Sequence, residues 1–215
     1  MGSRRVVLST DGGNISKNAF HSNDMRNDVV KSLKGNLYKG EVVYYEIVGY
    51  EPNGNPIMPL VNTKKISKEF AKEYSNSGEK DRMVYKYGCV EKTAKAYVYR
   101  IIHVNEDGKY RDMPWNDMVK RATQLGLETP VVLFHGKLIE LKDKYHLDEN
   151  KNLNLEDIFF DFSDGPDPLD SSHWREGIVV RIEKNFDDLK AYKLKNFNFK
   201  TMESASEEAS IEDLS

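Results

Sequence analysis

The chain contains 215 residues, enough for one large domain with its own core, and its 39% hydrophobic and 31% charged residues are ordinary for a soluble globular protein. No uninterrupted apolar run is long enough to cross a bilayer, and the N-terminus has no apolar stretch typical of a secretory signal peptide. The net charge of −3, taken over the whole chain, weakly disfavours nucleic-acid binding.

An acidic C-terminal segment accounts for the sign of that charge. Residues 201–215 hold five acidic residues and no lysine or arginine. Because the chain has 32 basic and 35 acidic residues in all, the remainder is mildly basic, which permits a local basic groove. We therefore expect a folded domain over residues 1–200 and a Ser/Glu-rich tail over 201–215 that frays.

The single cysteine, Cys89, excludes an internal disulfide and a zinc site built from several cysteines. A chain of this kind fits a reducing setting, so we expect an intracellular, cytoplasmic protein. Cys89 follows a glycine and has no base beside it in the sequence, so we expect a small buried residue.

Hydrophobic periodicity and turn residues predict the elements of secondary structure. In chain order they are a strand at 5–8, a turn at 11–14, a helix capped by Asn23 or Asp24 and ending before Gly35, a strand at 42–50, a turn at 52–56, a helix within 65–75, a strand at 96–104, a helix from Pro114 to Gly126, a strand at 131–134, a helix at 155–162, and strands near 177–183 and 190–199. Strands and helices mix without regular βαβ alternation, and this predicts an α+β fold built on antiparallel sheets flanked by helices.

Side chains alternate along a strand, so the pattern also predicts which residues share a face. Each of four strands brings polar or aromatic groups to a face that is otherwise apolar. The expected sets are Glu46 with Tyr44 and Val48; Tyr97, Tyr99, Ile101 and His103; Glu176 with Ile178, Val180 and Ile182; and Lys193, Lys195, Phe197 and Phe199.

If these faces converge, the groups match the needs of nucleotide chemistry. Tyr99 supplies a ring on which a base can stack, and Glu46 supplies an acceptor for a ribose hydroxyl. Glu176 supplies a carboxylate for a divalent metal beside phosphates. Lys193 and Lys195 can direct positive charge at phosphate oxygens in a transition state.

Each of these signals also has an ordinary structural explanation. A tyrosine that alternates with valine is usually sheet packing, and a lone glutamate in a strand is commonly a solvated edge group. A Lys-x-Lys pair on a terminal strand commonly protects an edge from aggregation. The order and spacing of the signals, rather than any one of them, favour the functional interpretation.

Taken in order, the segments resemble the motifs of the ATP-dependent RNA ligase family, in particular the phage RNA ligase 2 group of the covalent nucleotidyltransferase superfamily, which includes DNA ligases and mRNA-capping enzymes. The likeness extends over almost the whole chain, and the last two motifs together are fairly specific. The similar segments are Gly2-Ser3-Arg4-Arg5 (the Ser-Arg segment), residues 44–50 (motif III), 96–101 (motif IIIa, with its stacking aromatic), 175–181 (motif IV) and 192–200 (motif V).

The resemblance implies a nucleotidyltransferase (ATP-grasp-like ligase) fold and a reaction in three steps. A lysine is adenylylated by ATP, the adenylate moves to a 5′-phosphate end of RNA, and a 3′-hydroxyl displaces AMP, with Mg²⁺ assisting. RNA ends are then the partners. The resemblance assigns nucleotide binding to Arg4, Glu46, Tyr99, Glu176, Lys193 and Lys195, catalysis to Glu176 and the two lysines, and the metal to Glu176.

One departure from the family pattern concerns motif I, which carries the nucleophile as Lys-x-Asp/Glu-Gly. The nearest string is Ser9-Thr10-Asp11-Gly12, with serine in place of lysine. Either the true motif lies upstream, in a missing N-terminal segment or a second chain, or this string is a degenerate motif of a pseudoenzyme. The position of Ser3-Arg4 ahead of a strand favours the first explanation, so we expect an N-terminally truncated domain that is catalytically incomplete alone.

Two other functions stay open at this point. A DNA ligase or capping-type relative would share the same motifs, and substrate profiling on nicked RNA and nicked DNA separates them. A nucleotide- or RNA-binding module without chemistry would bind through Tyr99 and Lys193 but form no covalent adduct.

Overall fold

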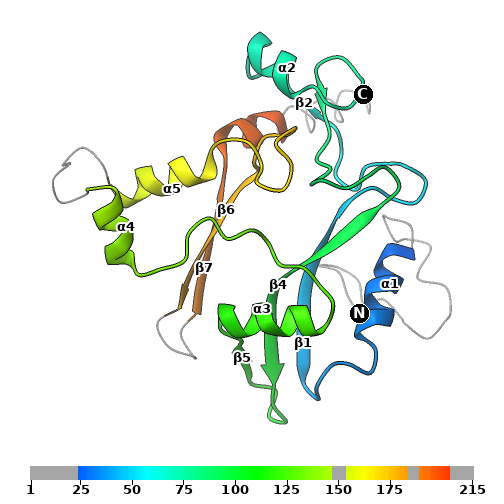
Figure 1. Cartoon of the computed structure of the whole chain (residues 1–215), viewed down its shortest axis with the longest axis vertical. Helices are drawn as coiled ribbons and strands as arrows, with labels where there is room; N and C mark the ends of the chain where they lie inside the picture. Colours follow the sequence, from blue (N-terminus) through cyan, green and yellow to red (C-terminus); the bar gives the residue numbers. More distant parts are fainter. Residues whose placement is uncertain (1–23, 147–153, 184–188, 204–215) are drawn as a thin grey trace, which may run out of the picture. The chain divides into compact units, whose positions relative to one another are not determined.

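The computed structural model describes residues 24–146, 154–183 and 189–203 (Figure 1). They form an α+β structure of helices and antiparallel sheets, as the sequence predicts. Among these residues, no helix is both long and apolar enough to cross a membrane. The predicted strand at 5–8, the turn at 11–14, Arg4 and the Ser9–Gly12 string lie outside the described residues.

Most predicted elements form close to their expected bounds. The observed elements are α1 (Asp24–Leu33), β1 (Glu41–Gly49), β2 (Val61–Asn62), α2 (Lys68–Tyr74), β3 (Arg82–Met83), β4 (Ala94–Val104), β5 (Tyr110–Asp112), α3 (Trp115–Gln124), α4 (Leu138–Lys144), α5 (Leu155–Ser163), β6 (Gly177–Glu183) and β7 (Leu189–Lys195).

The chain divides into two compact units, which we describe separately. The first contains the described residues within Met1–Met58, Lys86–Pro130 and Glu183–Leu189. The second contains those within Pro59–Tyr85, Val131–Ile182 and Lys190–Ser215. Neither unit is a continuous piece of sequence, so each depends on contacts between distant segments.

The first unit is built on a three-stranded antiparallel sheet in the order β1-β4-β5, with α3 lying against it (Figure 1). The helix begins after Pro114 and ends before Gly126, whose φ of +71° suits a residue without a side chain. Its Met118 and Ala122 are fully buried against Val98 and Ile101 of β4. These apolar contacts hold the helix on one face of the sheet.

A buried ion pair fastens the end of that helix to the sheet. The Arg121 guanidinium donates to both carboxylate oxygens of Glu41, at 2.7 and 2.8 Å, and to the backbone carbonyl of Asn36 at 2.6 Å. The hydrogen bond from Arg121 lowers the pKa of Glu41 below its ordinary value. Paired in this way, the two charges avoid the large cost of burying either one alone.

The second unit holds the paired strands β2-β3 and β6-β7 with helices α2, α4 and α5. Its core centres on Tyr85, whose ring lies 4.8 Å from the His173 ring and 5.6 Å from that of Phe199. All three side chains are buried. A second aromatic group joins Trp174 to Phe70 and Tyr74 of α2, at ring distances of 5.4 and 5.1 Å.

In this unit one predicted strand is absent from the described residues and another is shorter than predicted. Residues 131–134 form no ladder with any described residue, and they are 36–46% exposed, so this apolar β-branched run without a pairing partner stays irregular. The last strand ends at Lys195, and residues 197–203 are helical. The helix therefore includes residues 201–203 of the segment expected to fray, and Met202 is fully buried.

Candidate functional site

In the first unit, Glu46 and Tyr99 lie on the same face of the β1-β4 sheet, opposite α3. Glu46 pairs with Tyr97 across the ladder. Tyr44 pairs with Arg100 while the next residue of β1 pairs with Val98, so Tyr99 is the extra residue of a β-bulge. A bulge of this kind turns two neighbouring side chains to one side of the strand, here Tyr99 and Arg100. Tyr99 is 46% exposed.

The same bulge corrects part of the predicted face. Tyr97 and Tyr99 share a face, as expected, but beyond the extra residue the alternation is shifted by one. Ile101 is therefore in the core beneath α3, and His103 pairs with Glu41 on that side. The prediction that Ile101 and His103 share the Tyr99 face is wrong, because strict alternation assumes an unbroken ladder.

Near Tyr99, the aromatic rings of Tyr44 and Tyr110 lie close to the Arg100 guanidinium. The Tyr44 ring lies 6.3 Å from that of Tyr99. The Arg100 guanidinium lies 5.3 Å from the Tyr44 ring centre and 5.4 Å from that of Tyr110. Asp112 fixes the guanidinium from β5 with hydrogen bonds of 2.5 and 2.9 Å, which raise the pKa of Arg100.

This arrangement places the half-exposed Tyr99 beside other aromatic rings and an ion pair. Sequence reasoning missed Arg100 and Asp112, because the pair depends on the β4-β5 ladder and no local pattern announces it.

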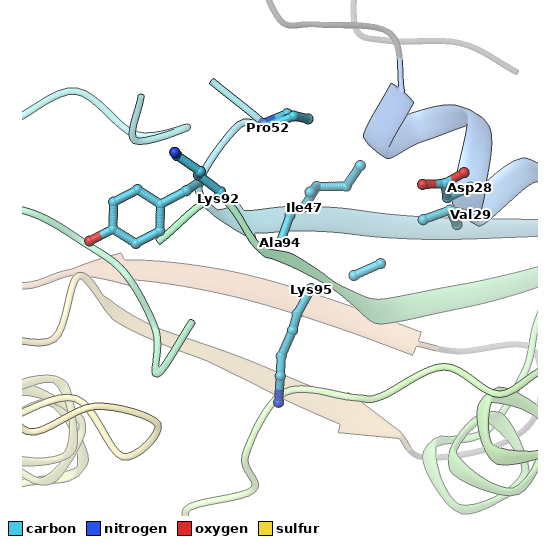
Figure 2. Close-up of a pocket in the computed structure, with 9 residues that line it drawn as sticks. Asp28, Val29, Ile47, Pro52, Lys92, Ala94 and Lys95 are labelled. Atoms are coloured by element: carbon cyan, nitrogen blue, oxygen red, sulfur yellow. The ribbon is translucent and has the colours of Figure 1, made fainter. Parts of the chain in front are cut away.

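A hollow of about 220 Å³ also lies in the first unit, between α1 and the adjoining ends of β1 and β4 (Figure 2). Figure 2 shows Asp28 and Val29 on the helix and Ile47, Ala94 and Lys95 on the strands. Neither Glu46 nor Tyr99 lines it. Glu46 and Tyr99 therefore lie outside this hollow, on the sheet face opposite α3.

In the second unit, motif IV and motif V form one hairpin. Glu176 directly precedes β6, and its backbone carbonyl accepts a hydrogen bond from the Asn196 N–H, just after β7, at 2.8 Å. Gly177 allows this close approach: a Cβ there would lie 2.1 Å from the Leu194 carbonyl oxygen. Lys193 and Lys195 alternate on β7 and so share a face. The structure thus brings Glu176 and both lysines into one small element.

The two lysines differ in their surroundings. Lys193 is exposed. The Lys195 ammonium donates to the Glu203 carboxylate at 2.5 Å and lies 5.1 Å from the centre of the Phe199 ring. Sequence reasoning missed Glu203, since it was assigned to the tail.

The predicted position of the two phenylalanines beside the lysines needs correction. Phe197 and Phe199 follow the end of the strand, and lie in the helical segment 197–203. Phe197 is 76% exposed, whereas Phe199 is 1% exposed and belongs to the core with Tyr85. They do not share a strand face with Lys193 and Lys195, because β7 ends before them.

Glu176 is half-buried in an environment that contains other acids. Burial raises the pKa of the Tyr85 phenol, and the nearby charges of Glu176, Asp167 and Glu203 raise it further. Burial also raises the pKa of Asp167.

The two residues that precede Glu176 are both fixed by contacts of their side chains. The Arg175 guanidinium donates to the backbone carbonyls of Phe162, Asp164 and Pro166. It is thus committed to the loop that precedes motif IV. The Trp174 indole packs on α2 and donates to Asp164 at 3.0 Å.

Within the described residues, no group of three or more histidine, cysteine, aspartate or glutamate side chains could hold a metal ion by itself. A carboxylate such as Glu176 can still share a Mg²⁺ ion with phosphate oxygens and water, which is how this ion is commonly bound beside nucleotides. The donor set present thus fits a magnesium–phosphate complex better than a metal site built from protein alone.

The structure therefore brings the predicted residues together as two groups, Glu46 with Tyr99 in the first unit and Glu176 with Lys193 and Lys195 in the second.

The family model described as RNA ligase matches residues 3–197, and the chain belongs to the RNA ligase family. No curated protein and no solved structure gives a significant match to the chain. Membership in this family supports a ligase-type function that acts on RNA ends.

Proposed function

We propose that this chain is the adenylate-handling domain of an ATP-dependent RNA ligase that uses Mg²⁺. In this proposal Tyr99 stacks on adenine, Glu46 accepts a hydrogen bond from the ribose, and Arg4 also contacts the nucleotide. Glu176 binds the metal, and Lys193 and Lys195 bind phosphate oxygens.

The observation that carries the proposal is the β6-β7 hairpin. Glu176 and both lysines come from segments that are separate in sequence, yet the Asn196 N–H bonds the Glu176 carbonyl at 2.8 Å. An acid and two amines on one hairpin can bind a magnesium–triphosphate, since the acid can bind the metal and the amines can bind the oxygens. The bulge at Tyr99, which turns a half-exposed ring out of the ladder, supports the role of a stacking ring.

Lysine variants of β7 test the phosphate role directly. We expect Lys193→Ala to weaken Mg²⁺–ATP binding about tenfold, because a charge-assisted contact to phosphate is lost. Lys190→Ala is the matched control, since Lys190 is an exposed lysine of the same strand at a position that points to the other face. Isothermal titration calorimetry measures both. Equal losses for the two variants would contradict the proposal.

A covalent assay tests the absence of a recognisable motif I. We expect no labelled band when the chain is incubated with α-³²P-ATP and Mg²⁺ and run on a denaturing gel, since the string nearest to motif I, Ser9-Thr10-Asp11-Gly12, has serine in place of the lysine. A band that survives denaturation would refute this part of the proposal.

The variant Ser9→Lys separates the two explanations for the missing lysine. Adenylylation by the variant would favour a degenerate motif in this chain. Continued absence would favour a lysine supplied from elsewhere, by another segment or a second chain. In that case, mixing the chain with a peptide that carries Lys-x-Asp-Gly is the next measurement.

A further inference from the structure

Asn196 occupies the junction between β7 and the helical segment 197–203. Its side chain is buried, with 3% of the residue exposed. Its Oδ1 accepts hydrogen bonds from the backbone N–H groups of Asn198 and Phe199, at 2.8 and 3.2 Å. These bonds make Asn196 the N-cap of the helical segment, which explains why the strand stops there.

The amide nitrogen of the same side chain makes two further bonds. Nδ2 donates to the Asp164 carboxylate at 2.7 Å and to the Ser163 carbonyl at 3.3 Å. An asparagine side chain has two N–H donors and an oxygen with two lone pairs, so every one of these is used. Aspartate and serine can serve as helix caps, but aspartate cannot donate to Asp164, and serine is too short to do both.

Asn196 connects to two of the three residues of the proposed phosphate site, Glu176 and Lys195. Its backbone N–H donates to the carbonyl of Glu176 at 2.8 Å. The helical segment that it caps carries Glu203, which holds the Lys195 ammonium at 2.5 Å. Its partner Asp164 also accepts the Trp174 indole N–H at 3.0 Å, two residues before Glu176.

We propose that Asn196 is a positioning residue that fixes Glu176 relative to Lys195, so that metal and phosphate oxygens are bound together. This inference rests on the proposed function. A helix cap alone would need only the Oδ1 atom. The buried Nδ2 bonds to Ser163 and Asp164 join the cap to the loop that precedes motif IV, and thereby tie motif V to motif IV.

The exchange of Asn196 and Asp164 tests this role. Asn196→Asp keeps the capping oxygen but sets two carboxylates against each other, and we expect about tenfold weaker binding of Mg²⁺–ATP. In the double variant Asn196→Asp/Asp164→Asn the hydrogen bond between the two side chains can re-form with its donor reversed. The Oδ1 atom of Asp164 accepts from both Asn196 and the Trp174 indole, so the reversed bond competes with the bond from Trp174, and the Ser163 carbonyl loses its donor. We therefore expect the double variant to recover part of the lost affinity.

The ratio of Mg²⁺–ATP affinity to adenosine affinity is the readout that a purely structural role would not change. Adenosine lacks phosphates, so its affinity, measured by competition, should stay unchanged in Asn196→Asp while that of Mg²⁺–ATP falls. The control is Asn154→Asp, the same change at the N-cap of α5, where Asn154 accepts from the Asp157 N–H. We expect this control to bind both ligands as the wild type does, and thermal unfolding verifies that each variant is folded.

The outcomes are distinct. Parallel loss of adenosine and ATP affinity, an unchanged ATP affinity, or a double variant no better than the single one would each overturn the inference while leaving the proposed function in place. A wild-type chain that binds neither ligand would refute the proposed function, and the inference with it.

Discussion

Substitution of Gly177 tests whether the tight β6-β7 hairpin is what holds Glu176 beside the lysines. In Gly177→Ala the new Cβ would lie 2.1 Å from the Leu194 carbonyl oxygen and 2.8 Å from the Lys195 Cα. Both are backbone atoms, so no side chain can rotate away, and overpacking of this kind costs about 1–3 kcal/mol. The φ of +149° adds about 1–3 kcal/mol, because residues with a side chain rarely adopt it.

The two terms together predict a loss of about 4 kcal/mol in the free energy of unfolding, or a melting temperature lower by about 10 °C. Circular dichroism during urea and thermal unfolding measures both quantities. The matched control is Gly78→Ala in the same unit, where φ is +83° and no atom lies within 4 Å of the added Cβ. That control should lose about 1 kcal/mol, from backbone strain alone.

Binding of Mg²⁺–ATP should fall in Gly177→Ala even at a temperature where the variant is fully folded, because β7 must move away from Glu176 to make room. If Gly177→Ala were as stable as Gly78→Ala and bound ATP like the wild type, the close approach of Leu194 to Gly177 would be refuted. The β6-β7 hairpin would then no longer explain how Glu176 and the lysines form a phosphate site.

Three further predictions concern the first unit. Glu41→Gln should lower the free energy of unfolding by about 3 kcal/mol at neutral pH, because Arg121 loses its anionic partner. Arg121 lowers the folded-state pKa of Glu41 from 4.5, so the ionised pair stabilises the fold above that pH, and the stability difference from wild type in urea titrations should close as the pH falls below it. A stability difference independent of pH would contradict the pairing. Tyr99→Ala should weaken ATP binding about tenfold while Tyr99→Phe keeps it, since stacking needs the ring and not the hydroxyl; equal calorimetric affinities for Ala and Phe would argue against stacking. Cys89 is buried with its sulphur 3.8 Å from the Val48 carbonyl, so Ellman's reagent should react with it only after unfolding, and rapid reaction of the native chain would disprove that burial.

The sequence alone determined most of the elements and the order of the motifs. Hydrophobic residues that recur every few positions, with turn residues beside them, predict the helices α1 and α3 and the long strands β1 and β4. Both helices end just before a glycine, Gly35 and Gly126. Such signals are local, because the residues that generate them also form the element. The resemblance to RNA ligases likewise depends on the order of short strings, and the family match over residues 3–197 confirms it.

Only the tertiary structure decided where several of these side chains point. The bulge that turns out Tyr99 and places His103 on the α3 face exists because β1 and β4 pair with an offset of one residue. The end of β7 at Lys195 depends on Asn196, whose bonds reach a loop more than thirty positions earlier in the chain. The ion pair between Lys195 and Glu203 likewise depends on tertiary structure, as does the fact that residues 131–134 pair with no strand among the described residues. Strand register, caps and ion pairs depend on which distant segments meet, and a periodicity of two or three residues carries no information about that meeting.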